Sequence, residues 1–263
     1  MNSDPLTAAS VPDDSIVRDD QAEFYSLLDA AGERRGRRAR LKLIDTGRLP
    51  SEEMNRLGRA GVELYCSDRS GRTPEDLAGM IAAAKKGGGL TAYFHHGPLG
   101  DEPDAGRAFD SVREIARRGA RVCLSNKTME RNPDALRTLA GDARRGRNRL
   151  VFYHHGVPSE EWEEAARTGV WFHFALIAGG PDPDVHRFRA LAKTAASGGA
   201  GLILHLERRL PVETLEELLA GRIRLQMFTP PSDYRSPLRP LEERARRRGL
   251  PRRSYYLYPQ FMC

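Results

Sequence analysis

The strongest constraint on the fold is a regular alternation between short strand-like runs and helical patterns. Eight such runs occur, at residues 41–44, 62–66, 90–95, 121–125, 150–155, 170–176, 201–206 and 223–228. The segments between them open with N-cap residues, prolines or acidic residues, as at Thr73-Pro-Glu-Asp, which are helix start signals. Strands separated by helices favour parallel pairing, and eight units predict an α/β fold of the (β/α)8 TIM-type barrel class.

An open, doubly wound sheet is the alternative architecture. That fold places a glycine-rich phosphate loop after its first strand, whereas this chain has Asp45-Thr-Gly-Arg-Leu-Pro there. The length of 263 residues fits one barrel. We therefore expect a disordered leader over residues 1–18 and a single barrel domain over residues 19–263, with an N-terminal helix near 19–36 and a C-terminal tail from 250.

Alternating positions along each strand divide into an apolar set and a polar set. The apolar set would pack against the helices, so the polar set is predicted to face the barrel interior. Ordinary barrels fill that interior with branched aliphatic residues. The polar set includes Lys42, Glu63, Arg121 and Arg224 near the strand starts, and we expect these four to form a buried ion cluster.

Histidines gather in the same polar set near the carboxyl ends of the strands, where barrel enzymes carry their catalytic groups. These candidates are His95, His155, His173 and His205, followed by Glu207. Imidazole and carboxylate ligands suit Zn²⁺, Mn²⁺ or Fe²⁺, so the five residues form a predicted divalent-metal site. Two alternatives stay open: metal-free acid–base work, with His95, His155 and Glu207 as catalytic groups, and a purely structural hydrogen-bond network.

His95 and His155 belong to two Phe/Tyr-His-His-Gly segments, and a slip of one residue would exchange each with its neighbour, His96 or His154. Each pair is therefore held as a joint candidate. In the register preferred here, the neighbours His96 and His154 would face the helices or enter the loop.

Further candidates surround this position and suit an anionic substrate. Lys127, after the fourth run, is a candidate catalytic lysine, an anion ligand or an exposed loop residue. Arginine forks recognise carboxylates and phosphates, which makes Arg208 and Arg235 candidates for substrate binding. Tyr93, Tyr153 and Ser125 complete the predicted substrate-binding set.

The net charge of +6 and the pI of about 9.4 leave nucleic acid open as a partner. The aromatic, arginine-rich tail would stack single-stranded bases or fold back on the barrel. No apolar run is long enough for a membrane span, the first residues lack a signal-peptide core, and three scattered cysteines do not suggest a disulfide framework. We expect a cytoplasmic protein without a membrane partner.

The histidine-rich mouth resembles those of amidohydrolase-type and sugar-isomerase-type barrels. The His-x-His motif of the first amidohydrolase strand is absent, because Leu43-Ile-Asp-Thr stands there, and no family is assigned. The sequence predicts an enzyme that acts on a small polar or anionic substrate by metal-assisted hydrolysis or by lyase or isomerase chemistry. A basic nucleic-acid-binding barrel and a non-catalytic scaffold are the alternatives.

Overall fold

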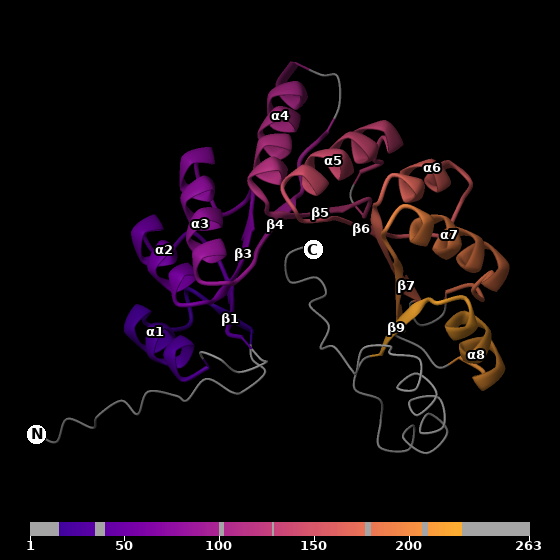
Figure 1. Ribbon diagram of the computed structural model, residues 1–263, viewed down its shortest axis with the longest axis horizontal. Coiled ribbons are helices and arrows are strands. Elements are labelled where there is room, and N and C mark those ends of the chain that lie inside the picture. The colour runs from indigo at the N-terminus through magenta and orange to yellow at the C-terminus, as the bar shows by residue number, and fades with distance from the viewer. Residues whose placement is uncertain are drawn as a thin grey trace, which may run out of the picture. The chain divides into compact units, whose positions relative to one another are not determined.

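The computed structural model describes residues 16–34, 40–99, 103–127, 129–176, 180–206 and 210–227. Within these residues, nine strands alternate with eight helices, and every strand pairing described is parallel (Figure 1). The predicted fold class, α/β with the strand–helix succession of a (β/α)8 barrel, is confirmed.

The chain divides into two compact units. The first runs to Phe94 and includes Arg118–Ala120, and the second takes His95–Arg117 and the chain from Arg121. The first unit contains β1 Ile16–Arg18, α1 Phe24–Glu33, β2 Lys42–Ile44, α2 Ser51–Arg59, β3 Glu63–Ser67, α3 Pro74–Lys86 and β4 Thr91–His95. The second contains α4 Pro103–Arg118, β5 Arg121–Ser125, α5 Pro133–Arg145, β6 Leu150–His154, α6 Glu161–Arg167, β7 Trp171–Leu176, α7 Val185–Ser197, β8 Leu202–Leu206, α8 Val212–Ala220 and β9 Arg224–Met227.

The prediction of a disordered leader over residues 1–18 is wrong at its end, because Ile16–Arg18 form β1. This strand pairs in parallel with β2, with Ile16 opposite Lys42. Its β-branched residues Ile16 and Val17 favour a strand, but three residues are too few to show an alternation. The N-terminal helix begins at Phe24 rather than at residue 19, and the tail from 250 lies outside the described residues.

The core of the second unit lies between its strands and the helices that follow them. Phe152 on β6 and Phe172 on β7 have ring centroids 5.8 Å apart, and Trp162 of α6 lies 5.0 Å from Phe152. Phe174 meets Phe188 of α7 edge to face at 5.1 Å. The phenylalanines are at most 2 % exposed, so the apolar set of this unit packs toward the helices as predicted.

Helices α4 and α5 are joined by one buried carboxylate. Asp142 of α5 has a 1 % exposed side chain and accepts from Nε of Arg113 and of Arg117, both on α4, at 2.9 Å each. Burial alone would raise the pKa of Asp142, but the hydrogen bonds from the two arginines outweigh it and hold that pKa below its usual value.

The face predicted for β4 is wrong. Residues paired across parallel strands share a side of the sheet, and Tyr65 pairs with Ala92 while Cys66 pairs with Tyr93. The rings of Tyr65 and Phe94 stack at 6.4 Å, which confirms that these two share a side. Tyr93 and Thr91 therefore lie on the side of Leu64, against the sequence expectation. All five residues of β4 are buried, so this strand offers no polar face to recognise.

Candidate functional site

The candidate site lies on one face of the second unit's sheet. The pairings put Tyr153 of β6 opposite His173 of β7, and Ala175 of β7 opposite His205 of β8. Side chains at these positions share a side, so Tyr153, His173 and His205 all lie on the face opposite the phenylalanine core. For these three strands the predicted polar face is confirmed.

His173 and His205 form a direct hydrogen-bonded pair. Nδ1 of His173 lies 2.9 Å from Nε2 of His205, and the two rings are 5.0 Å apart. The ring of Tyr153 lies 4.6 Å from that of His173 and 6.5 Å from that of His205. Among the described residues, Nε2 of His173 has no hydrogen-bond partner, so this nitrogen is available to a ligand.

The surroundings of the pair favour neutral imidazoles. Burial lowers the pKa of His205 to about 3. Burial also lowers the pKa of His173 well below its ordinary value; competition with the adjacent His205 for a proton and the positive charges of Arg149, Arg121 and Arg224 lower it further. One ring therefore donates the shared proton and the other accepts it, and His173 can present at Nε2 either a donor or an acceptor.

The first histidine of each His-His-Gly segment closes a turn. Nε2 of His95 lies 3.4 Å from the carbonyl oxygen of Pro98, and Nε2 of His154 lies 3.1 Å from that of Val157. Asn126 approaches Nδ1 of His154 through its amide nitrogen at 2.8 Å. These contacts assign the Nε2-protonated, neutral form to His154, consistent with the way burial lowers its pKa.

His154 lies on the helix side of its strand, with its ring 5.2 Å from Trp162 and 5.0 Å from Phe174. His155 follows the end of β6, and its backbone N–H donates to Asn126 Oδ1. Burial first, and then the charge of Lys127 and His154, lowers the pKa of His155. His155 therefore lies in the loop directly after β6, two residues beyond Tyr153.

The remaining predicted residues take several positions. Lys127 is exposed in the bend after β5, where its N–H donates to Ser125 Oγ, so it is not shielded in the way a Schiff-base lysine requires. Tyr93 is buried on β4, and burial followed by the charge of Asp68 raises the pKa of its phenol. Glu207, Arg208 and Arg235 lie outside the described residues.

The described residues contain no group of three histidine, cysteine, aspartate or glutamate side chains placed to hold a metal ion. His173 and His205 turn nitrogens toward each other at hydrogen-bond distance. The divalent-metal site stays a prediction, because its carboxylate, Glu207, lies outside the described part of the chain.

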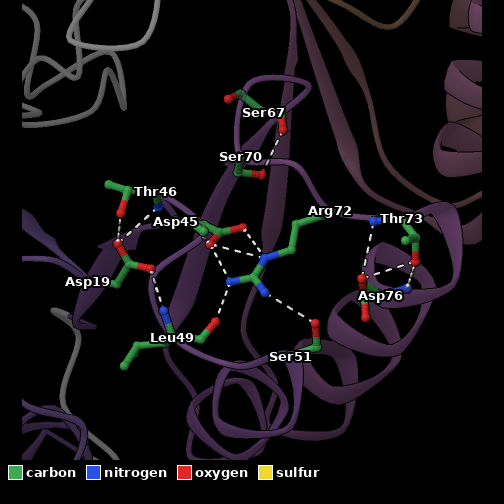
Figure 2. Close-up of polar contacts among 11 residues, drawn as sticks. Asp19, Asp45, Thr46, Leu49, Ser51, Ser67, Ser70, Arg72, Thr73 and Asp76 are labelled. Carbon is green, nitrogen blue, oxygen red and sulfur yellow. Dashed lines mark hydrogen bonds and ion pairs between the residues drawn. The ribbon is translucent and has the colours of Figure 1, made fainter.

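A carboxylate-rich network in the first unit was not singled out from the sequence. Asp45, directly after β2, is fully buried and holds Arg72 through both guanidinium nitrogens Nε and Nη2, the shorter contact being 2.7 Å (Figure 2). Arg72 also donates to Ser51 Oγ and to the carbonyl oxygen of Leu49. The guanidinium is thus engaged on every side, and Asp45 serves to fix the loop before α2.

Asp19, after β1, has a similar role. It is 0 % exposed and accepts from the backbone N–H groups of Thr46 and Leu49 and from the Thr46 hydroxyl (Figure 2). Both aspartates follow directly after parallel strands, the position that carries catalytic groups in barrels. Their hydrogen bonds are satisfied by the protein itself, so this network is structural.

Comparisons with known proteins leave the chain without an assigned family. No family model and no curated protein matches the sequence. Solved structures similar to it include a variant of NCR from Zymomonas mobilis, at 13 % identity over 85 % of this chain and 79 % of that chain, with a TM-score of 0.40. A citrate synthase variant, SbnG, has 10 % identity over 79 % and 94 % of the two chains, with a TM-score of 0.35. Likenesses this weak say nothing about function.

Within the residues described, no helix is both long enough and apolar enough to cross a bilayer.

Proposed function

We propose that this chain is an enzyme that moves a proton on a small, polar, anionic substrate, in a lyase or isomerase reaction, with His173 as the acid–base group. The observation that supports this is the 2.9 Å contact between His173 Nδ1 and His205 Nε2, which leaves Nε2 of His173 for the substrate. Positioned imidazoles are the commonest general acids and bases in enzymes.

The pair fixes the tautomer of His173. When Nε2 of His173 takes a proton from the substrate, its Nδ1–H goes on donating to Nε2 of His205, and in the return step Nε2 of His173 gives the proton back. Tyr153 lies against both rings and limits their rotation. His205, at 2 % exposure, positions His173 rather than meeting the substrate itself.

The proposal favours lyase or isomerase chemistry over metal-assisted hydrolysis. A metal ion held by both rings at their facing nitrogens would have to replace the hydrogen bond between them. Burial is the main cause of the low pKa of His173 and the nearby arginine charges add to it, so a negative charge on the substrate would raise that pKa toward its ordinary value.

Hydrogen–deuterium exchange tests the proposal without knowledge of the final product. The purified protein is incubated in D2O with a panel of small carboxylates and phosphomonoesters, and loss of C–H signals is followed by proton NMR. We expect exchange in at least one compound, slowed about 10²–10⁴-fold by His173→Gln. His186→Gln is the matched control, because His186 is exposed on α7.

A positioning role for His205 predicts that His205→Gln lowers kcat more than it raises KM. Exchange that survives His173→Gln unchanged would contradict the proposal. Exchange that disappears on chelation and returns with a stoichiometric divalent ion would support the metal-dependent alternative instead.

A further inference from the structure

Three arginines meet at the amino ends of the second unit's strands. Arg121 is the first residue of β5, Arg224 is the first residue of β9, and Arg149 directly precedes β6. The pairings place all three on the side of the sheet that carries Trp171, the first residue of β7. Arg121 and Arg224 are two of the four residues in the ion cluster predicted from the sequence. The other two, Lys42 and Glu63, belong to the first unit, so that four-residue cluster stays a prediction.

Trp171 organises this cluster. The guanidinium carbon of Arg149 lies 4.7 Å from the centroid of the indole, and that of Arg224 lies 4.9 Å from it. Both guanidinium groups therefore make cation–π contacts with the indole ring. Because a guanidinium donates its hydrogen bonds within its own plane, stacking on the indole leaves its N–H edges for another partner.

Gly201 makes room for the indole. A Cβ atom at this position would lie 2.9 Å from Cζ3 and 3.2 Å from Cη2 of Trp171, closer than carbon atoms pack. The glycine directly precedes β8, between the strand of Trp171 and that of Arg224. A glycine at position 201 therefore leaves the space in which the indole contacts both Arg149 and Arg224.

The cluster lacks a counter-charge within the described part of the chain. Among the described residues, no ion pair or hydrogen bond engages the guanidinium of Arg121, Arg149 or Arg224, and Nε of Arg121 is buried without a partner. Burial, followed by the charges of Arg121 and Arg224, lowers the pKa of Arg149 to about 10. By contrast, the buried guanidinium of Arg72 is paired with the carboxylate of Asp45.

We propose that Arg121, Arg149 and Arg224 bind a small phosphate-type oxyanion, either free phosphate or the phosphoryl group of a monoester. Three positive groups match a doubly charged anion better than a single carboxylate. A tetrahedral oxyanion also offers enough acceptor atoms for several guanidinium edges at once. A partly buried site strengthens these charge-assisted hydrogen bonds relative to those in water.

This anion site is distinct from the proposed acid–base centre. Trp171 precedes His173 by two residues, a step of about 6.6 Å along a strand, so the arginines lie one layer nearer the amino ends. The inference does not rest on the proposed reaction, and the two can fail separately.

Calorimetric titration with inorganic phosphate, at constant ionic strength set by chloride, tests the site on the full-length protein. We expect saturable binding of one phosphate and a saturable rise in the thermal unfolding midpoint, because a ligand that binds only the folded state stabilises it. Arg149→Met and Arg224→Met should each weaken the apparent affinity at least about tenfold, the loss of one charge-assisted hydrogen bond. Acetate at the same concentration should not bind measurably.

Two controls separate this site from general charge effects. Arg187→Met removes an exposed arginine of α7 that pairs with Asp184, and it should leave the phosphate affinity unchanged. His173→Gln should also leave it within about twofold, a change of less than 1 kcal/mol in binding free energy, if the two sites are separate.

The stability of the variants in chloride alone gives a second readout. If the arginines repel one another without an anion, Arg149→Met should keep or raise the unfolding midpoint in chloride. Phosphate binding equal in wild type and Arg149→Met would overturn the proposal. A lower midpoint in chloride together with no phosphate effect in wild type would also overturn it, because an acidic group of the protein would then be the counter-charge.

Discussion

At the residue scale, the chain's histidines divide by what surrounds each ring nitrogen. His154 has both nitrogens engaged, by Asn126 and by the Val157 carbonyl. His173 keeps Nε2 for a ligand, while its Nδ1 faces His205. The position of a histidine on a strand is therefore not enough to make it a catalytic candidate. Its ring must also have a nitrogen that is not already engaged by the protein, as His173 has.

Burial of the neutral pair makes the stability of the protein depend on pH. The pKa of His205 is about 3 in the folded state and near 6.5 in the unfolded chain. Below about pH 6.5 the unfolded state binds the proton more readily, so the folded state loses stability as the pH falls toward 3. Each such histidine contributes a slope of up to about 1.4 kcal/mol per pH unit.

We expect His205→Gln to reduce this acid-induced loss by up to about 1.4 kcal/mol per pH unit, because the glutamine does not titrate. Urea unfolding followed by circular dichroism between pH 7 and pH 5 measures the slope. His186→Gln, on the exposed face of α7, should keep the wild-type slope. An unchanged slope in His205→Gln would show that this histidine titrates normally.

At the element scale, the sequence predicts which way the side chains of a strand face only where one face is apolar and the other polar. On β7, Phe172 and Phe174 alternate with Trp171 and His173, and the predicted faces agree with the pairings. On β4 both faces are buried, so the alternation carries no polar signal and the predicted face is wrong. The three-residue strand β1 is not predicted, because it lies at the end of a stretch rich in proline, serine and aspartate.

The contact between His173 and His205 could not be predicted from their sequence positions. It depends on the register that sets Ala175 opposite His205, which places His173 diagonally across from it. A shift of the pairing would separate the rings. The residues of the polar face could thus be predicted from the sequence. Which of these residues contact one another depends on the strand register, which the sequence does not reveal.

Two glycine substitutions test how the strands and helices of the second unit pack. Gly201→Ala would push a methyl group against Trp171, and we expect a loss of about 1–3 kcal/mol, typical of overpacking. Gly141→Ala lies within α5, where an added Cβ meets no atom within 4 Å, and should stabilise by about 0.5–1 kcal/mol.

Chemical denaturation gives both values. Tryptophan emission, to which Trp162 and Trp171 both contribute, is compared between Gly201→Ala and wild type to detect a movement of the Trp171 indole. Equal stability of Gly201→Ala and wild type, with unchanged emission, would mean that the ring does not need the space that Gly201 leaves.

At the scale of the whole molecule, the net charge of +6 says less about partners than the local pairing of arginines does. Several exposed arginines on helices of the second unit pair with an acid three residues earlier: Arg137 with Asp134, Arg167 with Glu164, and Arg187 with Asp184. Such pairs contribute little to stability, but they neutralise the surface on which they lie.

We therefore expect binding to nucleic acid to be weak and dominated by salt. Fluorescence anisotropy with a single-stranded oligonucleotide should show affinity falling steeply between 50 and 200 mM salt, as counterion release requires. Sequence-selective binding that persists at about 200 mM salt would instead favour the alternative of a nucleic-acid-binding barrel.

The two histidine-closed turns change how a sequence of this type should be searched for catalytic groups. His95 and His154 make the same bond, from the same ring nitrogen to the carbonyl oxygen three residues later. A His-His-Gly segment that ends a strand in this chain is therefore a turn-closing histidine followed by a second histidine in the loop, not a doubled active-site motif.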